Sequence, residues 1–333
     1  MTRVGLIGGG RWGAVHRNAL RAVGGELAAV LVESESSAER LRQEWRVPVE
    51  TDLDAFLGIA SEAVIVASPN YLHAGHALAV LASGRHVLIE KPMALSNAEC
   101  REVLDAGERT GRLVAVGHEM RVFGLFAEVR RIVDSGDLGA PLHLKLDLWR
   151  RPYRSGSGGW KSDPGKLGST ILEEPIHYLD LARWYLGPVA GVQAWGSSRA
   201  GREDLWENLE IRLEHESDGR SWVTRSIAAF GHQVTLMLIA EEGALRASWR
   251  GKSDMDPEPV VSLTRHDSGG TEVVPLSRET GHAFDVPRQT RAFLAAIYGW
   301  GPTPATAEDG CAAVALCLAA QKSLEAGSVL VEP

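Results

Sequence analysis

Apolar runs of strand length alternate with segments of helical periodicity through the first third of the chain. The apolar runs lie at 3–8, 26–33, 62–69, 86–92 and 112–118. Apolar residues recur at helical spacing between them, at 12–23, 37–45, 73–84 and 97–111. Continuous apolar strands separated by helices are typical of a parallel sheet that is covered on both faces. We therefore predict a doubly wound α/β domain over residues 1–122.

The pattern changes after residue 122. A helix predicted at 126–136 leads to a strand at 141–149, in which polar and apolar residues alternate. A loop rich in glycine, serine and basic residues follows at 150–169, and then a helix at 175–187. Successive strands are predicted over 189–275 and two closing helices at 286–300 and 307–327. This order predicts an α+β domain over residues 123–333 with a largely antiparallel sheet.

Composition narrows the class of protein. The 333 residues are too many for one core of typical size, which agrees with two domains. The formal net charge of −8, without a basic run, argues against a nucleic-acid partner. The three cysteines are scattered without a CxxC pair, so we predict neither a metal site nor a disulfide framework. The longest apolar run, at 311–320, is too short for a membrane span, and we see no signal peptide, so we expect a reducing, cytoplasmic setting without a membrane partner.

A glycine-rich segment, IGGGRWGAVH at 7–16, joins the first predicted strand to the first predicted helix. Gly8, Gly10 and Gly13 have the spacing of a dinucleotide-binding loop, which requires this position between strand and helix. The first glycine permits the tight turn, the second lets the backbone approach a pyrophosphate, and the third lets helix and strand pack closely. We predict that the cofactor binds at Gly8, Gly10, Arg11, Trp12 and Gly13.

Glu33 bears on the choice between NAD and NADP. It lies at the end of the second predicted strand, about 20 residues after Gly13, where a carboxylate binds the ribose hydroxyls of adenosine. A carboxylate repels a 2′-phosphate, so Glu33 favours NAD. Ser34 and Arg40 offer groups that would hold a 2′-phosphate, and NADP therefore stays open.

Two more segments end predicted strands, ASPNYLH at 67–73 and IEKP at 89–92. Ligands bind at the carboxyl ends of the strands in a doubly wound sheet. A charge pair and a proline are an unusual end for a buried strand, where glycine, asparagine or serine more often forms the turn. We therefore predict that the cofactor lies near Ser68, Asn70, His73, Glu90 and Lys91.

Together these motifs resemble the glucose–fructose oxidoreductase, inositol dehydrogenase and MocA (Gfo/Idh/MocA) family. The first half matches through IGGGRWG, VIVASPNYLHAGHALAVLASGRHVLIEKPMALS and VGHEMR, and the second half through GDLGAP, GGWKSDPGKLGSTILEEPIHYLDLARWYLG and FLAAI. The resemblance covers essentially the whole chain. It implies a Rossmann domain followed by an open-faced antiparallel sheet. It also implies hydride exchange between NAD(P) and a hydroxyl group of a sugar, a cyclitol or a derivative.

The resemblance also implies catalytic roles. Lys91 is similar to the family's active-site lysine, which acts on the reacting oxygen, with Glu90 and Pro92 positioning it. The Lys–Pro bond at this point is often cis in the family. His177, in STILEEPIHYLD, matches the general acid/base histidine. Relatives usually have aspartate four residues before that histidine, whereas this chain has Glu173.

Pro175 leaves the partner of His177 open. Proline favours the first position of a helix, and a helix beginning there would make Glu174 its cap and turn Glu173 aside. An earlier helix start would place Glu173 beside His177 at a spacing of i,i+4. The competing interpretation of His177 is a core histidine bonded to Asp180, which we interpret as structural.

Several other polar residues are candidates for contact with the substrate. His118 and Arg121 follow the last strand of the first domain, and Glu119 stands where relatives often have asparagine. The loop at 150–169 adds Arg151 and an aromatic ring, Trp160, that is suited to stacking on a sugar. Ordinary solvation is the alternative for the loop residues. The predicted substrate-binding residues are Lys91, His118, Arg121, Tyr153, Trp160, Lys161, Glu173, Glu174 and His177.

We therefore predict an NAD(P)-dependent dehydrogenase or reductase that acts on the CH–OH groups of a sugar or cyclitol. His177 would take the hydroxyl proton while Lys91 stabilises the developing alkoxide, without a metal. A redox-neutral NAD-dependent glycosidase or epimerase and a non-enzymatic nucleotide-sensing regulator are the alternatives. Retention of Lys91 and His177 argues against the regulator. The resemblance further suggests a homodimer or homotetramer formed through the open face of the sheet.

Overall fold

The computed structural model describes residues 1–152, 157–199, 206–227, 231–253 and 255–333. The chain divides into two compact units, and neither is a continuous range. The first unit contains Met1–Glu119, Ser155–Gly168 and Val286–Val314. The second contains Met120–Arg154, Ser169–Asp285 and Ala315–Pro333. Residues 155–168 and 286–314 thus belong to the first unit, although residues 120–154, which precede both in the sequence, belong to the second.

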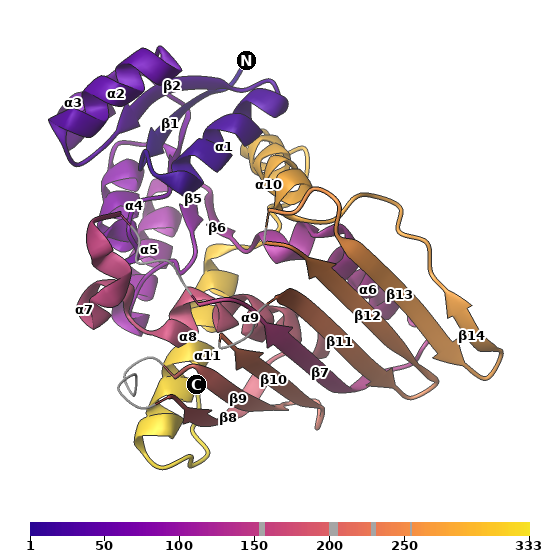
Figure 1. Cartoon of the computed structure of the whole chain (residues 1–333). Coiled ribbons are helices and arrows are strands. Elements are labelled where there is room, and N and C mark those ends of the chain that lie inside the picture. Colours follow the sequence, from indigo (N-terminus) through magenta and orange to yellow (C-terminus); the bar gives the residue numbers. More distant parts are fainter. Residues whose placement is uncertain (153–156, 200–205, 228–230, 254) are drawn as a thin grey trace. The chain divides into compact units, whose positions relative to one another are not determined.

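A parallel sheet of six strands forms the centre of the first unit (Figure 1). The strands are β1 (Arg3–Ile7), β2 (Glu26–Leu31), β3 (Val49–Glu50), β4 (Ala63–Val66), β5 (His86–Glu90) and β6 (Val114–Gly117). Their order in the sheet is β3-β2-β1-β4-β5-β6, so the strand order reverses between β1 and β4. A crevice at such a reversal, beyond the carboxyl ends of the strands, is where doubly wound sheets bind dinucleotides.

Several helices belong to the first unit. They are α1 (Arg11–Ala22), η1 (Asn70–Leu72), α2 (Glu35–Trp45), α3 (Leu53–Gly58), α4 (His73–Ala82), α5 (Asn97–Thr110), η3 (Ser157–Ser162) and α7 (Pro164–Leu167). Ser96 caps α5 by accepting a hydrogen bond from Glu99 N at 3.2 Å, and Gly111 ends it at φ 62°. The periodicity pattern did not predict β3 and α3, because a strand of two residues has no period to detect.

One apolar core joins helices from both ends of the sequence to the sheet of the first unit. Leu20 of α1, Leu41 of α2 and Phe293 pack in one buried cluster with Leu6 and Ile65 of the sheet. Phe293 belongs to α10 (His282–Ile297), which begins four residues before the predicted start at 286 and contains Pro287. The boundary between the two units falls inside α10 and inside α11 (Ala307–Glu325).

The second unit contains an eight-stranded sheet in the order β14-β13-β12-β11-β7-β10-β9-β8. The strands are β7 (Pro141–Trp149), β8 (Val189–Ser197), β9 (Asn208–His215), β10 (Arg220–Ser226), β11 (His232–Ala240), β12 (Gly243–Gly251), β13 (Val260–Asp267) and β14 (Gly270–Val273). All neighbouring pairs are antiparallel except β7 and β10, which confirms the predicted, largely antiparallel sheet. Alternate residues of β7, Leu144, Leu146 and Leu148, are buried, so one face of the sheet is covered and the other carries the polar positions.

The remaining helices are η2 (Glu119–Val122), α6 (Gly124–Ser135), α8 (Thr170–Glu173) and α9 (Pro175–Leu186). The segment predicted as a loop at 150–169 holds two short helices in its described part, η3 and α7. Asp163 stabilises α7 by accepting a hydrogen bond from Gly165 N at 3.0 Å. Within the residues that the structure describes, no helix is long and apolar enough to span a membrane.

Candidate active site

Of the three glycines in the predicted dinucleotide-binding loop, Gly8 and Gly13 are required by the packing of the first unit itself. Gly8 has φ +108°, and a Cβ there would lie 2.4 Å from the carbonyl oxygen of Ala67. A Cβ on Gly13 would lie 2.0 Å from the carbonyl oxygen of Gly8. Real Cβ atoms do not come this close to backbone oxygens, so neither position admits a side chain without displacement of the backbone. The loop between β1 and α1 is therefore built for glycine at both positions.

Gly10 differs, because nothing in the protein excludes a side chain there. Its φ is −81°, and a Cβ would meet no heavy atom of the described residues within 4 Å. Gly10 is exposed and precedes the first turn of α1, where no described side chain caps the helix by a hydrogen bond. Backbone N–H groups at such a helix start attract phosphate groups. The residues present thus fit the pyrophosphate of a dinucleotide, for which Gly10 leaves room.

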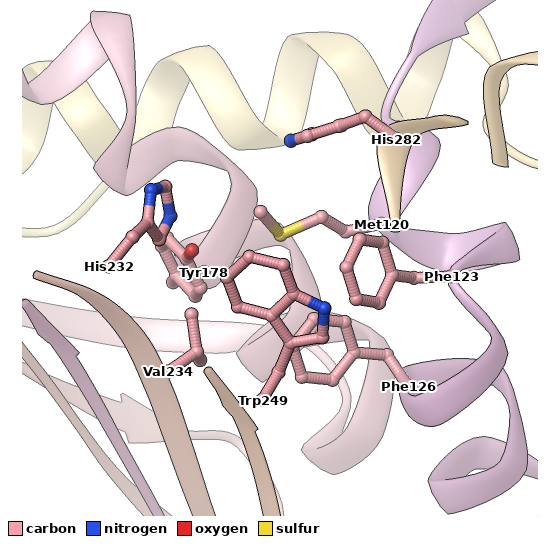
Figure 2. Close-up of a pocket in the computed structure, with 8 residues that line it drawn as sticks. All are labelled: Met120, Phe123, Phe126, Tyr178, His232, Val234, Trp249 and His282. Atoms are coloured by element: carbon pink, nitrogen blue, oxygen red, sulfur yellow. The ribbon is translucent and has the colours of Figure 1, made fainter. Parts of the chain in front are cut away.

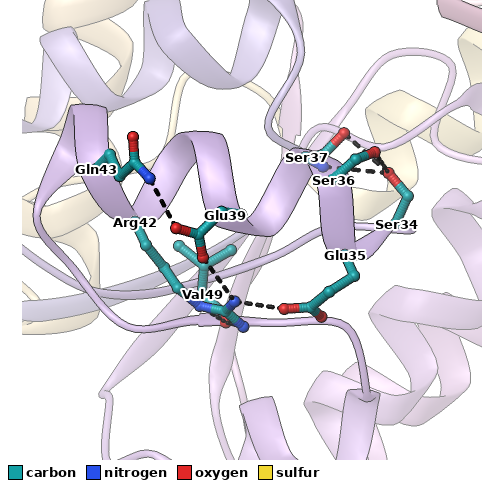
Figure 3. A network of polar contacts seen from close by, with 8 residues as sticks. All are labelled: Ser34, Glu35, Ser36, Ser37, Glu39, Arg42, Gln43 and Val49. Carbon is teal, nitrogen blue, oxygen red and sulfur yellow. Dashed lines mark hydrogen bonds and ion pairs between the residues drawn. The ribbon is translucent and has the colours of Figure 1, made fainter.

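The segment after β2 holds Arg40 and Arg42 in ion pairs. Figure 3 shows the contacts of Arg42. Arg42 pairs with Glu35 and also donates to the carbonyl oxygen of Val49 at 2.7 Å. Arg40 lies 3.2 Å from Glu44. Glu33 is exposed two residues beyond the end of β2. The position predicted for the adenosine ribose therefore presents a carboxylate, and both nearby guanidinium groups are engaged by carboxylates.

His73 links the two segments that follow β4 and β5. Its Nδ1 lies 2.7 Å from the carbonyl oxygen of Pro92, and its Nε2 lies 2.7 Å from that of Ser68. Burial lowers the pKa of His73, although its hydrogen bonds to the two carbonyl groups and the charge of Glu90 favour the protonated ring. Only an imidazolium could donate to both carbonyl groups at the same time. We therefore expect a neutral ring at neutral pH, which donates to one carbonyl at a time. Asn70 of the same segment donates to the carbonyl oxygen of Leu167 at 3.2 Å.

Lys91 follows the last residue of β5 and is partly buried. The peptide bond between Lys91 and Pro92 is cis, as the family resemblance suggested. Glu90 is buried, and its Oε2 accepts a hydrogen bond from the backbone N of Lys91 at 3.2 Å. Its Oε1 lies 2.7 Å from Nε2 of His16, which is fully buried. Lys91 therefore extends from a backbone that is fixed at the carboxyl end of the parallel sheet.

The second unit holds the predicted acid/base histidine and both glutamates in buried positions. Glu173 ends α8, Glu174 has φ −143° and ψ −47°, and α9 begins at Pro175. The predicted helix start at Pro175 is thus confirmed. Glu174 occupies the cap position, but its side chain does not cap α9; it forms an ion pair with Arg150. His177 N instead donates to the backbone carbonyl of Glu174 at 3.1 Å.

Arg121 and Asp180 form a buried ion pair within the second unit. Arg121 donates to the two carboxylate oxygens of Asp180 at 2.8 and 2.6 Å. Only 5% of the Arg121 side chain and 2% of the Asp180 side chain are exposed. The guanidinium also lies 5.5 Å from the ring centroid of Trp184. These contacts support a structural role for Asp180 and give Arg121, predicted to bind substrate, a buried partner in its own unit.

The remaining candidates are His118, Glu119, Tyr153, Trp160 and Lys161. His118 and Glu119 are both buried just after β6. Trp160 and Lys161 lie in η3, where the ammonium group is 5.2 Å from the indole centroid. Tyr153 lies outside the described residues.

A small cavity in the second unit, drawn in Figure 2, is lined mainly by aromatic residues. Its lining residues are Met120, Phe123, Phe126, Tyr178, His232, Val234, Trp249 and His282. Its volume of about 10 Å³ is close to the space that one water molecule needs. A sugar needs at least an order of magnitude more, so this cavity is not a substrate pocket.

Two residues that contact predicted site residues, His16 in the first unit and Arg150 in the second, were missed by sequence reasoning. His16 lies on the buried face of α1 with Gly13, Ala19 and Leu20. A histidine on a helix face that is otherwise small and apolar was the signal in the sequence that could have identified His16. For Arg150 there was none, because its partner Glu174 lies 24 residues further along the chain.

Comparisons with known proteins give one consistent result. A family model described as an oxidoreductase family with an NAD-binding Rossmann fold matches residues 2–118. A second model, the Gfo/Idh/MocA C-terminal domain, matches residues 126–246. The chain is 30% identical over 340 residues to inositol 2-dehydrogenase 2 of Saccharopolyspora erythraea, covering 98% of this chain and 94% of that protein. It is 27% identical over 342 residues to 1,5-anhydro-D-fructose reductase of Ensifer adhaerens, covering 98% and 97%.

The fold is also similar to that of solved structures. One is a levoglucosan dehydrogenase in complex with NADH and levoglucosan, with a TM-score of 0.86 and 19% sequence identity. The similarity covers 99% of each chain. At this identity the comparison shows the fold alone.

Proposed function

The chain belongs to the Gfo/Idh/MocA family of NAD-dependent oxidoreductases, and on that premise we propose how its residues divide the work of the reaction. One observation carries the proposal: the Glu90-Lys91-Pro92 segment stands at the carboxyl end of β5, at the edge of the sheet where doubly wound folds bind their ligands. An ammonium group at that edge is suited to polarise an oxygen atom.

We propose that the substrate is a sugar or a cyclitol that reacts at a secondary hydroxyl group. The relatives support this class, because they include an inositol dehydrogenase and an anhydrofructose reductase. Residues Trp160 and Lys161 supply a ring for stacking and a donor for hydroxyl groups, and His118 and Tyr153 supply further polar groups. These side chains would select the substrate rather than take part in the chemistry.

His177 acts as the general base in the direction of oxidation. Its imidazole takes the proton of the substrate hydroxyl, and the ammonium group of Lys91 stabilises the negative charge that develops on that oxygen. NAD, when bound, would supply the hydride acceptor, C4 of its nicotinamide, for the hydrogen of the reacting carbon. In the reverse direction the imidazolium of His177 returns the proton to the carbonyl oxygen.

Glu173 is proposed to orient His177 and to strengthen it as a base. The ion pair of Glu174 with Arg150 supports this choice, because it gives the second carboxylate another partner. Glu173 lies four residues before His177, and both are buried. The extra methylene of glutamate compensates for the break between α8 and α9 at residue 174.

A screen tests the proposed activity. The purified protein is incubated with NAD⁺ or NADP⁺ and with myo-inositol, glucose, levoglucosan and sugar acids, and with NADH and 1,5-anhydrofructose, while the nicotinamide absorbance is followed. We expect turnover of at least one of these compounds with a net change in absorbance. Conversion without a net change would instead indicate the redox-neutral chemistry. NADH binding without conversion of any compound would indicate a regulator.

We further propose that the protein is a homodimer or homotetramer that associates through the open face of the second unit's sheet. Trp149, Trp195 and Ile239 are 52%, 39% and 38% exposed there. A hollow of about 380 Å³ lies between strands that carry Trp149 and Trp195. Tryptophan is enriched at protein interfaces, and a monomer rarely exposes several such side chains on one sheet.

Sedimentation of the wild type and of a Trp149→Glu/Trp195→Glu variant tests the assembly. We expect a multiple of 35.9 kDa for the wild type and a single chain for the variant. A wild-type protein that sediments as one chain at micromolar concentration would contradict the proposal.

A further inference from the structure

Two histidines from two different helices hold the residues on either side of Lys91. His16 of α1 contacts the side chain of Glu90, which precedes the lysine, at 2.7 Å. His73 of α4 contacts the carbonyl oxygen of Pro92, which follows it, also at 2.7 Å. The lysine is thus flanked by two contacts that both belong to the first unit.

The contact between His16 and Glu90 is buried. The side chain of His16 is 0% exposed and that of Glu90 is 9% exposed. A buried carboxylate is costly unless hydrogen-bond donors satisfy its oxygens. Here Nε2 of His16 donates to Oε1 of Glu90, and the backbone N of Lys91 donates to Oε2 of Glu90 at 3.2 Å. Each oxygen of Glu90 therefore has a donor, and one of the two donors is the backbone of the lysine itself.

The neighbouring strand leaves a space for this carboxylate. Gly117 of β6 is the register partner of Glu90. A Cβ on Gly117 would lie 3.0 Å from the carboxyl carbon of Glu90 and 3.1 Å from its Oε1. The glycine on one strand and the histidine on α1 thus fix the direction of the Glu90 side chain.

We propose that His16 is a positioning residue for Lys91: through the carboxylate of Glu90, it fixes the backbone from which the lysine extends. This inference rests on the role proposed above for Lys91. The same helix, α1, carries Gly13 and begins next to Gly10. Cofactor binding and placement of the lysine therefore depend on one rigid element.

Removal of His16 leaves Glu90 with one donor in a buried site. The carboxylate then turns toward water or takes up a proton, and its hydrogen bond to the backbone of Lys91 weakens. A displacement of about 1 Å in a catalytic group costs about 10²-fold in rate. His16→Leu removes the donor at similar size, whereas His16→Gln keeps an N–H group at the place of Nε2.

A kinetic experiment compares these two variants in the wild-type and Lys91→Met backgrounds. The substrate is the compound among myo-inositol, glucose and levoglucosan that the wild type oxidises fastest with NAD⁺. We expect His16→Leu to lower kcat about 10²-fold, with NADH affinity unchanged within a few fold, and His16→Gln to retain most of the activity. In the Lys91→Met background, His16→Leu should lower kcat by less than about twofold, because the group that it positions is gone.

The matched control is His86→Gln, at the opposite end of the same strand, β5. His86 Nδ1 accepts a hydrogen bond from Leu113 N at 3.0 Å, far along the strand from Lys91. Its kcat should equal that of the wild type. An equal loss from His16→Leu in both backgrounds would show that His16 supports the fold generally and would overturn the inference. Full activity of Lys91→Met alone would overturn the proposed role of Lys91, and this inference with it.

A second measurement, by NMR, needs no substrate. If His16→Leu does not fold, His16→Asn takes its place in this measurement. The chain has six lysines, so ¹³C-dimethylation gives few NMR signals, and the Lys91 signal is identified by its loss in Lys91→Met. With NADH bound, we expect the Lys91 signal to move in His16→Leu or His16→Asn, to stay near its wild-type position in His16→Gln, and the other lysine signals to remain unchanged. A Lys91 signal that does not move when the donor is removed would overturn the inference.

Discussion

The carboxylate of Glu174 forms an ion pair with Arg150, and the two residues lie 24 positions apart in the second unit. This pair gives Glu174 a partner other than His177, and we therefore propose that the adjacent Glu173 is the carboxylate that acts on His177. A carboxylate partner favours the protonated form of an imidazole. Which of the two glutamates acts on His177 can therefore be tested through the pH dependence of the reaction.

We predict that Glu173→Gln moves the lower limb of the pH–rate profile for oxidation toward acid pH and lowers the maximal rate. The substitution removes the negative charge at constant size, so the imidazole of His177 holds its proton less tightly and becomes a weaker base. Glu174→Gln, the matched control, should leave the limb in place and reduce stability through the loss of its pair with Arg150. A shift in Glu174→Gln but not in Glu173→Gln would move the assignment by one residue.

Lys91→Met should lower turnover by about 10²–10³-fold, the usual cost of removing one group that stabilises an oxyanion. NADH affinity, measured by fluorescence titration, should stay within a few fold. Lys166→Met is the control, because Lys166 is an exposed lysine of the same unit that lies 3.8 Å from Asp163. Near wild-type turnover in Lys91→Met would show that the ammonium group has no part in the reaction.

NADH should bind at least about tenfold more tightly than NADPH, a difference of about 1.4 kcal/mol. The exposed carboxylate of Glu33 opposes a 2′-phosphate, and Arg40 and Arg42 are held by glutamates. Titration of both reduced cofactors by fluorescence measures the ratio, and Glu33→Ser should narrow it. Tighter binding of NADPH by the wild type would refute the assignment of Glu33.

Gly10→Ala and Gly13→Ala should fail in different ways. A Cβ at position 10 meets no described protein atom within 4 Å, so Gly10→Ala should keep its stability but bind NADH at least about tenfold more weakly. A Cβ at position 13 would collide with the backbone of Gly8, so Gly13→Ala should lose about 1–3 kcal/mol of stability. Urea unfolding and NADH titration of both variants separate the two effects. Unchanged NADH affinity in Gly10→Ala would place the pyrophosphate elsewhere.

Stability should fall between pH 6.5 and pH 4 in part because of His76. Burial, with a smaller effect of His73, lowers the pKa of His76 from its ordinary value of 6.5 to about 4. Between these two pH values His76 is protonated in the unfolded chain but not in the folded protein. The contribution of the neutral His76 to the free energy of unfolding is therefore complete above pH 6.5 and is lost as the pH falls toward 4. Relative to wild type, His76→Gln should lose about 2 kcal/mol less of its unfolding free energy between pH 7 and pH 5. Parallel curves for the two proteins would show that His76 does not titrate in this way.

The sequence alone determined the features that depend on residues close together in the chain. The glycine spacing at 8–13 and the apolar runs that flank it predicted the parallel sheet and its nucleotide loop, because a turn and a buried strand each need a local pattern. Pro175 predicted the start of α9 for the same reason, since its ring favours the first helical position. The family resemblance added the role proposed for Lys91 and the type of reaction proposed.

The tertiary structure decided which polar groups meet. His16 and Glu90 are 74 positions apart, and Arg121 and Asp180 are 59 apart. Their contacts depend on which strands are neighbours, on the register between them and on how a helix packs over them. None of these leaves a local trace, because a histidine on a helix or a glutamate at the end of a strand has the same local sequence whatever faces it. For this reason the sequence left both glutamates open as the partner of His177; folding brings Arg150 to Glu174, which supports our proposal that Glu173 is that partner.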